Sequence, residues 1–225
     1  MWCAAVEYHF YWLSCDLPAL GRWKQAKKRE VKAMLLRSFA RDYEVVRRMK
    51  RGAEFELLDL LHPDNPTFAE FSNAQTLVEK AALCDRLVHA GRALSSRNGL
   101  EYSLFSKLLW YRAPLGWTMY DSLASKGLRL SENGRARFLK FYKALDDRGF
   151  SESCRNAQHA VDQERFPHFY PGRVLDKYLM ARAAGVNARI EIPLYFRALG
   201  ESSSYVSDLA DIMATEFRDT LIDLD

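Results

Sequence analysis

Apolar side chains recur along most of the chain at the three- and four-residue spacing of helices that are apolar on one face. This spacing predicts helices over residues 1–14, 24–50, 67–93 (one helix or two), 100–112, 121–128, 135–146, 151–165, 173–184 and 204–224. The last of these helices should have an apolar face made of Leu209, Met213, Phe217 and Leu221. Only 190–196 has β character, and it is too short and isolated to found a sheet. The pattern therefore predicts an all-α fold.

Local signals refine this picture at two helices. Apolar residues every four positions predict that the long helix over 24–50 buries a stripe made of Val31, Leu35 and Phe39. Thr67, followed three residues later by Glu70, fits a capping box at the start of a helix. Because no repeat or long linker divides the chain, we expect one helical domain over residues 1–225, or two closely packed lobes over 1–95 and 96–225.

The overall composition is that of an ordinary globular protein, with 48% hydrophobic and 28% charged residues. The four cysteines form no CxxC pair, and no basic segment precedes the first apolar stretch. That stretch, residues 1–14, is too short to span a bilayer and is interrupted by Glu7 and His9. We therefore expect a cytoplasmic monomer with reduced thiols and no membrane contact.

Charge is distributed unevenly. Residues 22–51 contain twelve lysine or arginine residues and three acidic ones, a net charge of +9, whereas the rest of the chain carries −5. A molecule polarised in this way has one face suited to a polyanion, although a long helix can also carry such charges only to solvate its outer face.

Most motifs for metal or nucleotide chemistry are absent from the sequence. The five histidines have no HxxxH, HExxH or CxxC companions, and no GxxxxGK[ST] or GxGxxG run is present. We expect neither a metal site nor a cofactor.

Residues 105–128 combine a lysine and an aspartate with several aromatic side chains. An apolar helix should end near Pro114, an extended piece should follow over 117–120, and Asp121 falls where the next helix begins. A carboxylate at this place accepts the unpaired N–H groups of the first helical turn, so Asp121 is a natural N-cap. Such a residue is a cap more often than a catalyst, and both interpretations stay open at this point.

Three runs carry a resemblance to a known family: residues 106–110 (Ser-Lys-Leu-Leu-Trp), 119–122 (Met-Tyr-Asp-Ser) and 171–179. Over roughly residues 98–183 the chain resembles the helix-hairpin-helix DNA glycosylase superfamily. More narrowly, it is similar to bacterial proteins with an oxidised-guanine DNA glycosylase-like fold, a group that includes anti-phage DNA glycosylases. The resemblance implies a two-lobed helical fold with the pocket between the lobes, and double-stranded, modified DNA as the partner.

The resemblance also implies an activity. The enzyme would flip a modified base out of the duplex, either an oxidised purine or a hypermodified pyrimidine in phage DNA, and cleave its N-glycosidic bond. Asp121 corresponds to the aspartate that is common to the superfamily's active sites, and it would stabilise the oxocarbenium-like sugar. The superfamily's catalytic lysine follows a glycine-rich hairpin, where this chain has Glu101. Three roles therefore stay open for Lys107. It is a displaced nucleophile, which would add strand cleavage, or a phosphate or substrate contact, or an ion-pair partner of Asp121.

Further residues are assigned to the base pocket or to DNA on the same resemblance. The candidates for the base pocket are Ser106, Trp110, Trp117, Tyr120, Arg173 and Asp176, although aromatic residues of an apolar helix more often belong to the core. The candidates for DNA contact are Lys24, Lys27, Lys28, Arg47, Arg48, Asn98, Gly99, Lys126 and Lys177.

Two other functions fit the sequence. One is a non-catalytic nucleic-acid-binding protein that uses the basic segment 22–51, with Asp121 acting only as a cap. The other is an interaction protein that binds a partner through the apolar face of the last helix.

Overall fold

A computed structural model describes all residues except 98, 163, 167–168, 185–197, 199–202 and 222–225. The α-helices are α1 (Trp2–Tyr11), α2 (Leu17–Gln25), α3 (Arg29–Asp42), α4 (Glu54–Leu60), α5 (Pro66–Asn73), α6 (Leu77–Ala90), α7 (Tyr102–Arg112), α8 (Ser122–Gly127), α9 (Gly134–Asp146), α10 (Phe150–Ala160), α11 (Pro171–Ala184), α14 (Ser204–Glu216) and α15 (Arg218–Leu221). One π-helical turn, η1 (Trp12–Asp16), joins α1 to α2, and η2 (Val46–Arg48) and η3 (Arg92–Leu94) are short 3-10 turns.

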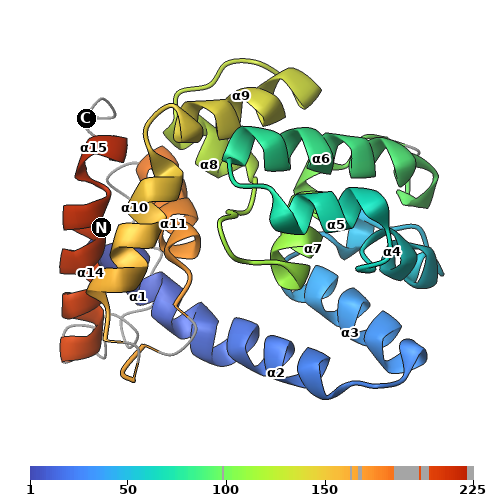
Figure 1. Ribbon diagram of the computed structural model, residues 1–225, viewed down its shortest axis with the longest axis horizontal. Coiled ribbons are helices and arrows are strands. Elements are labelled where there is room, and N and C mark those ends of the chain that lie inside the picture. The colour runs from blue at the N-terminus through green and yellow to red at the C-terminus, as the bar shows by residue number, and fades with distance from the viewer. Residues whose placement is uncertain (98, 163, 167–168, 185–197, 199–202, 222–225) are drawn as a thin grey trace.

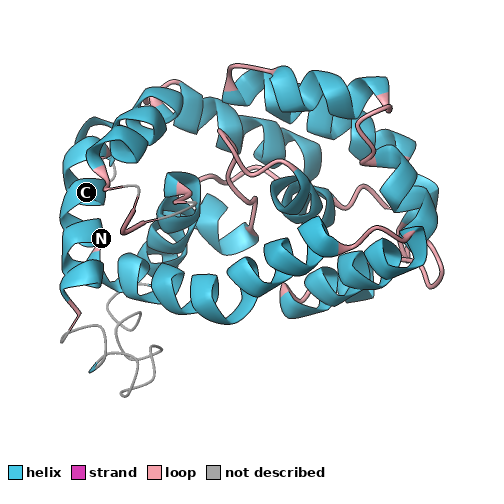
Figure 2. Cartoon of the chain, turned by 60° about the horizontal axis from the view of Figure 1, so that its bottom comes forward, coloured by secondary structure: helices cyan, strands magenta, loops and turns pink. Residues whose placement is uncertain are grey.

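Helices make up most of the described chain (Figure 2). The described residues contain no strand, only one isolated bridge between Met49 and Ser95, and the expected all-α class is confirmed. The stretch 190–196, which has β character in its sequence, lies outside the described residues. Within the described part, no helix combines the length and the apolar character needed to cross a bilayer.

The helices pack around a continuous cluster of buried apolar residues that extends from Ala4 to Leu221. Figure 1 shows α1, α10 and α14 gathered at one end of the molecule and α4, α5 and α6 at the other. Helix α7 packs on α3 and α6, and the short helix α8 packs closely on α11. The polypeptide that joins α7 to α8 is buried between these groups: Trp117, Thr118 and Met119 are each at most 1% exposed.

The prediction of a single long helix over 24–50 is wrong. Helix α2 ends at Gln25, the backbone at Ala26 and Lys28 is extended, and α3 runs only to Asp42. Residues 24–30 contain one apolar side chain, Ala26, so a continuous helix there would bury almost nothing. The predicted stripe is also wrong at Val31, which is 38% exposed, because α3 instead buries Ala33, Leu36, Phe39 and Ala40.

The capping box expected at Thr67 and Glu70 is also wrong. Helix α5 begins one residue earlier at Pro66, and the Asn65 side chain accepts the Phe68 N–H at 3.1 Å. Proline fits the first helical position because its missing N–H would have no partner there. A capping box is present at the start of α6, where Thr76 and Glu79 satisfy each other's backbone N–H groups.

The apolar face predicted for the last helix is confirmed. All four of its expected residues are buried, although the helix is divided at Phe217 into α14 and α15. Helix α14 lies against α1 and α10. The apolar face that an interaction protein would use is thus part of the protein's own core in this structure.

Candidate functional site

Short contacts fix the link between α7 and α8 and thereby position Asp121. The Trp117 indole donates to the Ser106 carbonyl at 2.9 Å, and the Tyr120 N–H donates to Ser106 Oγ at 3.1 Å. The Thr118 hydroxyl donates to the Gly172 carbonyl at 2.7 Å. One small hydroxyl residue on α7 therefore anchors the link at two points.

Close packing sets the distance between the link and α11. A Cβ added at Gly172 would lie 2.7 Å from the Trp117 carbonyl oxygen, and one added at Gly127 would lie 2.2 Å from the Leu179 carbonyl oxygen. Only glycine permits backbone segments to approach this closely. The first contact holds the link and the second holds the end of α8 next to α11, and Asp121 lies between these two points.

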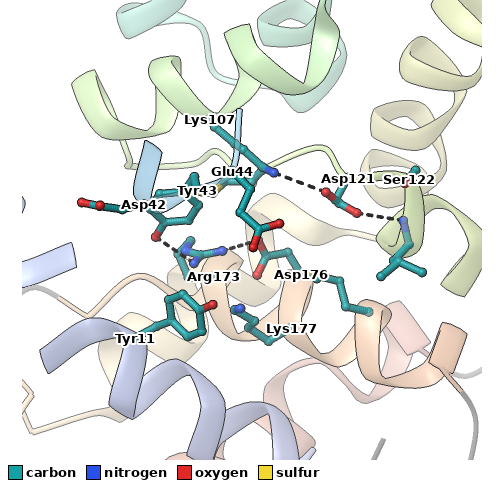
Figure 3. Close-up of a pocket in the computed structure, with 13 residues that line it drawn as sticks. Tyr11, Asp42, Tyr43, Glu44, Lys107, Asp121, Ser122, Arg173, Asp176 and Lys177 are labelled. Carbon is teal, nitrogen blue, oxygen red and sulfur yellow. Dashed lines mark hydrogen bonds and ion pairs between the residues drawn. The ribbon is translucent and has the colours of Figure 1, made fainter. Parts of the chain in front are cut away.

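A cavity of about 310 Å³, which we call the Asp121 cavity, lies where α1, the end of α3, α7, α8 and α11 meet (Figure 3). Four of its lining residues are acidic and three are basic; they are Asp42, Glu44, Asp121, Asp176, Lys107, Arg173 and Lys177. Tyr11, Tyr43 and Ser122 add polar groups, and Met119, Leu123 and Met180 add apolar surface. The small acidic excess favours a ligand or transition state with positive charge.

Lys107 and Asp121 form an ion pair in the wall of this cavity. The Lys107 Nζ lies 3.3 Å from Asp121 Oδ2, and the two side chains are 12% and 24% exposed. Asp121 Oδ1 accepts the Leu123 N–H at 2.9 Å, which confirms the predicted N-cap. One carboxylate oxygen therefore caps α8 and the other faces the lysine, so the alternative that Lys107 is an ion-pair partner of Asp121 is confirmed.

Arg173 is the centre of a buried polar network behind the cavity. Its side chain is 2% exposed and forms an ion pair with Asp176, one turn further along α11. Its Nη2 donates to the Tyr43 hydroxyl at 3.0 Å, and its Nε lies 3.5 Å from Asp16 Oδ2. The Tyr43 hydroxyl donates in turn to Asp16, the last residue of the π-helical turn η1. Arg173 therefore joins α11 to the end of α3 and to η1.

The carboxyl groups of this network are harder to ionise than usual. Burial raises the pKa of Asp176 to about 6, with the nearby Arg173 charge opposing the rise. Burial also raises the pKa of Asp16, again against the effect of Arg173. Two buried carboxyl groups share a single guanidinium, so ionising both would leave an uncompensated negative charge. Asp176 Oδ1 is itself buried and has no hydrogen-bond partner among the described residues.

Lys177 was expected at a DNA-contacting surface, and the structure corrects this. Its side chain is 5% exposed, and its Nζ lies 2.5 Å from Glu7 Oε1 and 3.8 Å from the centre of the Tyr11 ring. Lys177 therefore contacts α1 and forms part of the cavity wall.

Four of the six residues expected in the base pocket do not line the Asp121 cavity: Ser106, Trp110, Trp117 and Tyr120. Trp117 stacks on Tyr142 at 4.1 Å, and Tyr120 packs edge-on against Phe138 and Phe141. Trp110 is buried beneath the network, 5.3 Å from the Arg173 guanidinium. These aromatic residues belong to the core, as is more common in an apolar helix. Arg173 and Asp176, also expected in the base pocket, do line the cavity.

The residues expected to contact DNA divide into several groups. Lys24, Lys27, Lys28, Arg47 and Lys126 are exposed. Arg48 lies 3.4 Å from the Glu101 carboxylate, so a phosphate would compete with an internal partner. The Gly99 N–H donates to Ser95 Oγ at 2.8 Å and is not free for a phosphate, and Asn98 lies outside the described residues.

Sequence reasoning missed the contribution of the amino-terminal third to the cavity. Asp42, the last residue of α3, lines the cavity together with Tyr43 and Glu44, which follow the helix. Glu44 has φ of 57°, a left-handed conformation that residues other than glycine seldom adopt and that is frequent at functional sites. The sequence contained an indication of their role, because Asp42 and Glu44 are two of only three acidic residues in the basic segment 22–51.

Among the described residues, no three histidine, cysteine, aspartate or glutamate side chains are grouped so that they could hold a metal ion. No model of a known protein family, no curated protein and no solved structure matches this chain.

Proposed function

We propose that this protein is a DNA glycosylase on a two-lobed helical fold, which cleaves the N-glycosidic bond of a flipped-out, modified base. The proposal rests on one observation above all: the Lys107–Asp121 pair, 3.3 Å apart and mostly buried, lies in the wall of a cavity with an acidic lining. The family resemblance of residues 98–183 supplies the reaction, and the geometry is compatible with it.

The charge of the cavity suits this reaction. Breaking an N-glycosidic bond places positive charge on the sugar, and a fixed carboxylate close to the anomeric carbon stabilises that charge most in a site shielded from water. Asp121 is held in one orientation because its Oδ1 caps α8, which leaves Oδ2 for the sugar or for Lys107. A volume of about 310 Å³ lies at the lower end of the range of small-molecule sites.

Asp176 supplies a second chemical group. Because burial raises its pKa to about 6, part of its population is protonated near neutral pH, and its Oδ1 has no other partner among the described side chains. A neutral carboxyl group can donate a hydrogen bond or a proton to a ring nitrogen or carbonyl of the departing base. We assign Asp121 to the sugar and Asp176 to the base.

The role of Lys107 distinguishes two possible mechanisms. If its amine attacks the anomeric carbon, Asp121 is close enough to receive its proton, and the product is a Schiff base that also permits strand cleavage. If it does not, Lys107 serves as the counter-charge that orients Asp121, and the enzyme is monofunctional. Borohydride reduction distinguishes the two, since only the first mechanism gives a covalent adduct that is lost on Lys107→Ala.

The direct test is to incubate the protein with unmodified duplexes, with duplexes that contain oxidised purines and with hypermodified phage DNA, and to measure abasic sites and free base. We expect release from at least one modified DNA, and its loss in Asp121→Asn. Asparagine is as good an N-cap as aspartate, so this variant removes the charge but keeps the fold. Asp147→Asn is the matched control, because it neutralises an exposed carboxylate that pairs with Lys143. Absence of base release from every DNA would refute the proposal.

A second candidate is a non-catalytic nucleic-acid-binding protein. The exposure of Lys24, Lys27, Lys28 and Arg47 favours it, because phosphate neutralisation alone can bind DNA. Such a protein should bind DNA equally well with Asp121→Asn and release no base.

A further inference from the structure

A second cavity, of about 410 Å³, lies at the other end of α3. We call it the Trp23 cavity. Asp42, at the carboxyl end of α3, lines the Asp121 cavity, whereas Arg29, at the amino end, lines the Trp23 cavity. The 14 residues of α3 span about 21 Å at roughly 1.5 Å per residue, so the two cavities are separated by about that length.

The Trp23 cavity is strongly basic. Its charged lining residues are four lysine or arginine side chains and one carboxylate, namely Lys27, Arg29, Lys32, Arg112 and Asp59. The carboxylate is already satisfied, because Arg29 Nη2 donates to both Asp59 oxygens at 2.8 and 2.7 Å. Lys27, Lys32 and Arg112 form no ion pair with any described acidic residue, which leaves an excess of about three positive charges.

Two of these cations are gathered around one buried ring. The Arg112 guanidinium lies 4.4 Å from the centre of the Trp23 ring and the Lys32 ammonium 5.6 Å from it, while Trp23 is only 8% exposed. Arg112 Nε and Nη2 also donate to the Leu61 carbonyl, at 3.3 and 3.2 Å. Because both cations line the same cavity, an anion bound there would be attracted by both charges. The ring is engaged by cations, so the cavity suits an anionic group better than a stacked base.

The amino end of α3 adds to this preference. Its N-cap residue is Lys28, and no side chain caps the first turn. Uncapped N–H groups and the helix dipole both favour an anion at such an end. Arg29 and Lys32, in the first turn, line the cavity directly.

We propose that the Trp23 cavity binds a phosphate of the DNA backbone. The cavity itself indicates an anionic ligand, and the inference rests on the proposed function only in naming DNA as the source of the phosphate. The bound phosphate would thus lie about 21 Å, roughly the length of α3, from the nucleotide in the Asp121 cavity. The site acts as a remote anchor, which fixes the register of the duplex while Asp121 meets the sugar.

Binding to a duplex, measured by fluorescence anisotropy over a range of salt concentrations, tests the anchor. We expect the double variant Lys27→Gln/Lys32→Gln to lose roughly tenfold or more in affinity at 0.1 M salt, with a slope of log K against log salt that is shallower by about two. The control Lys140→Gln/Lys143→Gln makes the same change of charge on exposed lysines of α9. Equal losses in the two variants would mean that only the net charge matters and would overturn the inference.

The source of the phosphate is tested at the cavity itself. Five tryptophans give five indole N–H signals in a proton–nitrogen correlation spectrum, and the signal missing in Trp23→Phe identifies Trp23. We expect a duplex to shift this signal in the parent protein but not in Lys27→Gln/Lys32→Gln. A shift with inorganic phosphate or a nucleoside monophosphate but not with the duplex would overturn the assignment to the DNA backbone, as would no shift at all. Base release is not measured, so the anchor and the glycosylase activity can fail independently.

Discussion

Gly127→Ala tests how the structure positions Asp121. A methyl group at Gly127 would lie 2.2 Å from the oxygen, 2.9 Å from the carbon and 3.1 Å from the Cα of Leu179. All three are backbone atoms of α11, so no side-chain rotation can relieve the clash. An ordinary contact begins at 3.4 Å, and the shortfall of 3.4 − 2.2 = 1.2 Å has to be met by movement of α8 away from α11.

The cost of this movement can be given approximately. Overpacking a well-packed site costs roughly 1–3 kcal/mol, which in a protein of this length lowers Tm by roughly 2–12 °C. Under the proposed function, base release should fall more than stability does. Asp121 is the N-cap of α8 and moves with it, and a displacement of about 1 Å at a reacting group can reduce the rate by about a hundredfold.

Thermal unfolding and base release, measured on the same preparations, check both parts. Gly21→Ala is the control: Gly21 lies within α2, and a methyl group there would have no neighbour within 4 Å. Alanine at such a helix position should raise stability by about 0.5–1 kcal/mol. If Gly127→Ala is as stable as the parent protein, or if Gly21→Ala loses as much stability, the close packing of α8 on α11 is not what holds Asp121.

Three further predictions follow from contacts described above. Asp121→Ala should lower the free energy of unfolding by about 1 kcal/mol through loss of the cap, whereas Asp121→Asn should not; equal losses in urea denaturation would argue against the capping role. Asp176 has a folded pKa of about 6 against 3.8 unfolded, so the folded protein holds this proton more tightly, and stability relative to Asp176→Asn should fall by about 2 kcal/mol as the pH rises from 4 to 6. A difference between these two proteins that does not change with pH would exclude a raised pKa. Thr76→Ala should cost about 1 kcal/mol by opening the capping box of α6, and an unchanged denaturation midpoint would contradict that box.

The sequence predicted the features of the site that are local in the chain. Asp121 begins α8 directly after an extended link, and Lys107 is only 14 positions earlier, so both the cap and the pair could be anticipated. The base-pocket assignment of Trp110, Trp117 and Tyr120 is wrong because α7 is buried on most of its sides, with eight of its eleven residues buried. A sequence pattern then gives no indication of which face meets a cavity and which meets the core.

Contacts between distant segments could not be predicted in this way. Arg173 meets Asp16 and Tyr43 from more than a hundred positions away, and no periodicity connects them. The break between α2 and α3 occurs because residues 24–30 have almost no apolar side chain to bury. The apolar spacing over the whole range 24–50 does not show this local gap.

The Arg173 network limits how this protein can be divided. Residues 98–183 carry the family resemblance and would be the natural choice for a minimal fragment. Without the first 44 residues, however, that fragment would lose Asp16, Tyr43 and the Glu7 partner of Lys177. Of the four acidic residues that line the cavity, only Asp121 and Asp176 would remain beside Arg173 and Lys177, and one wall of the cavity would be missing. Residues 98–183 therefore do not form a separable unit, because they share the cavity with the amino-terminal helices. A truncated or grafted version of the site has to include those helices.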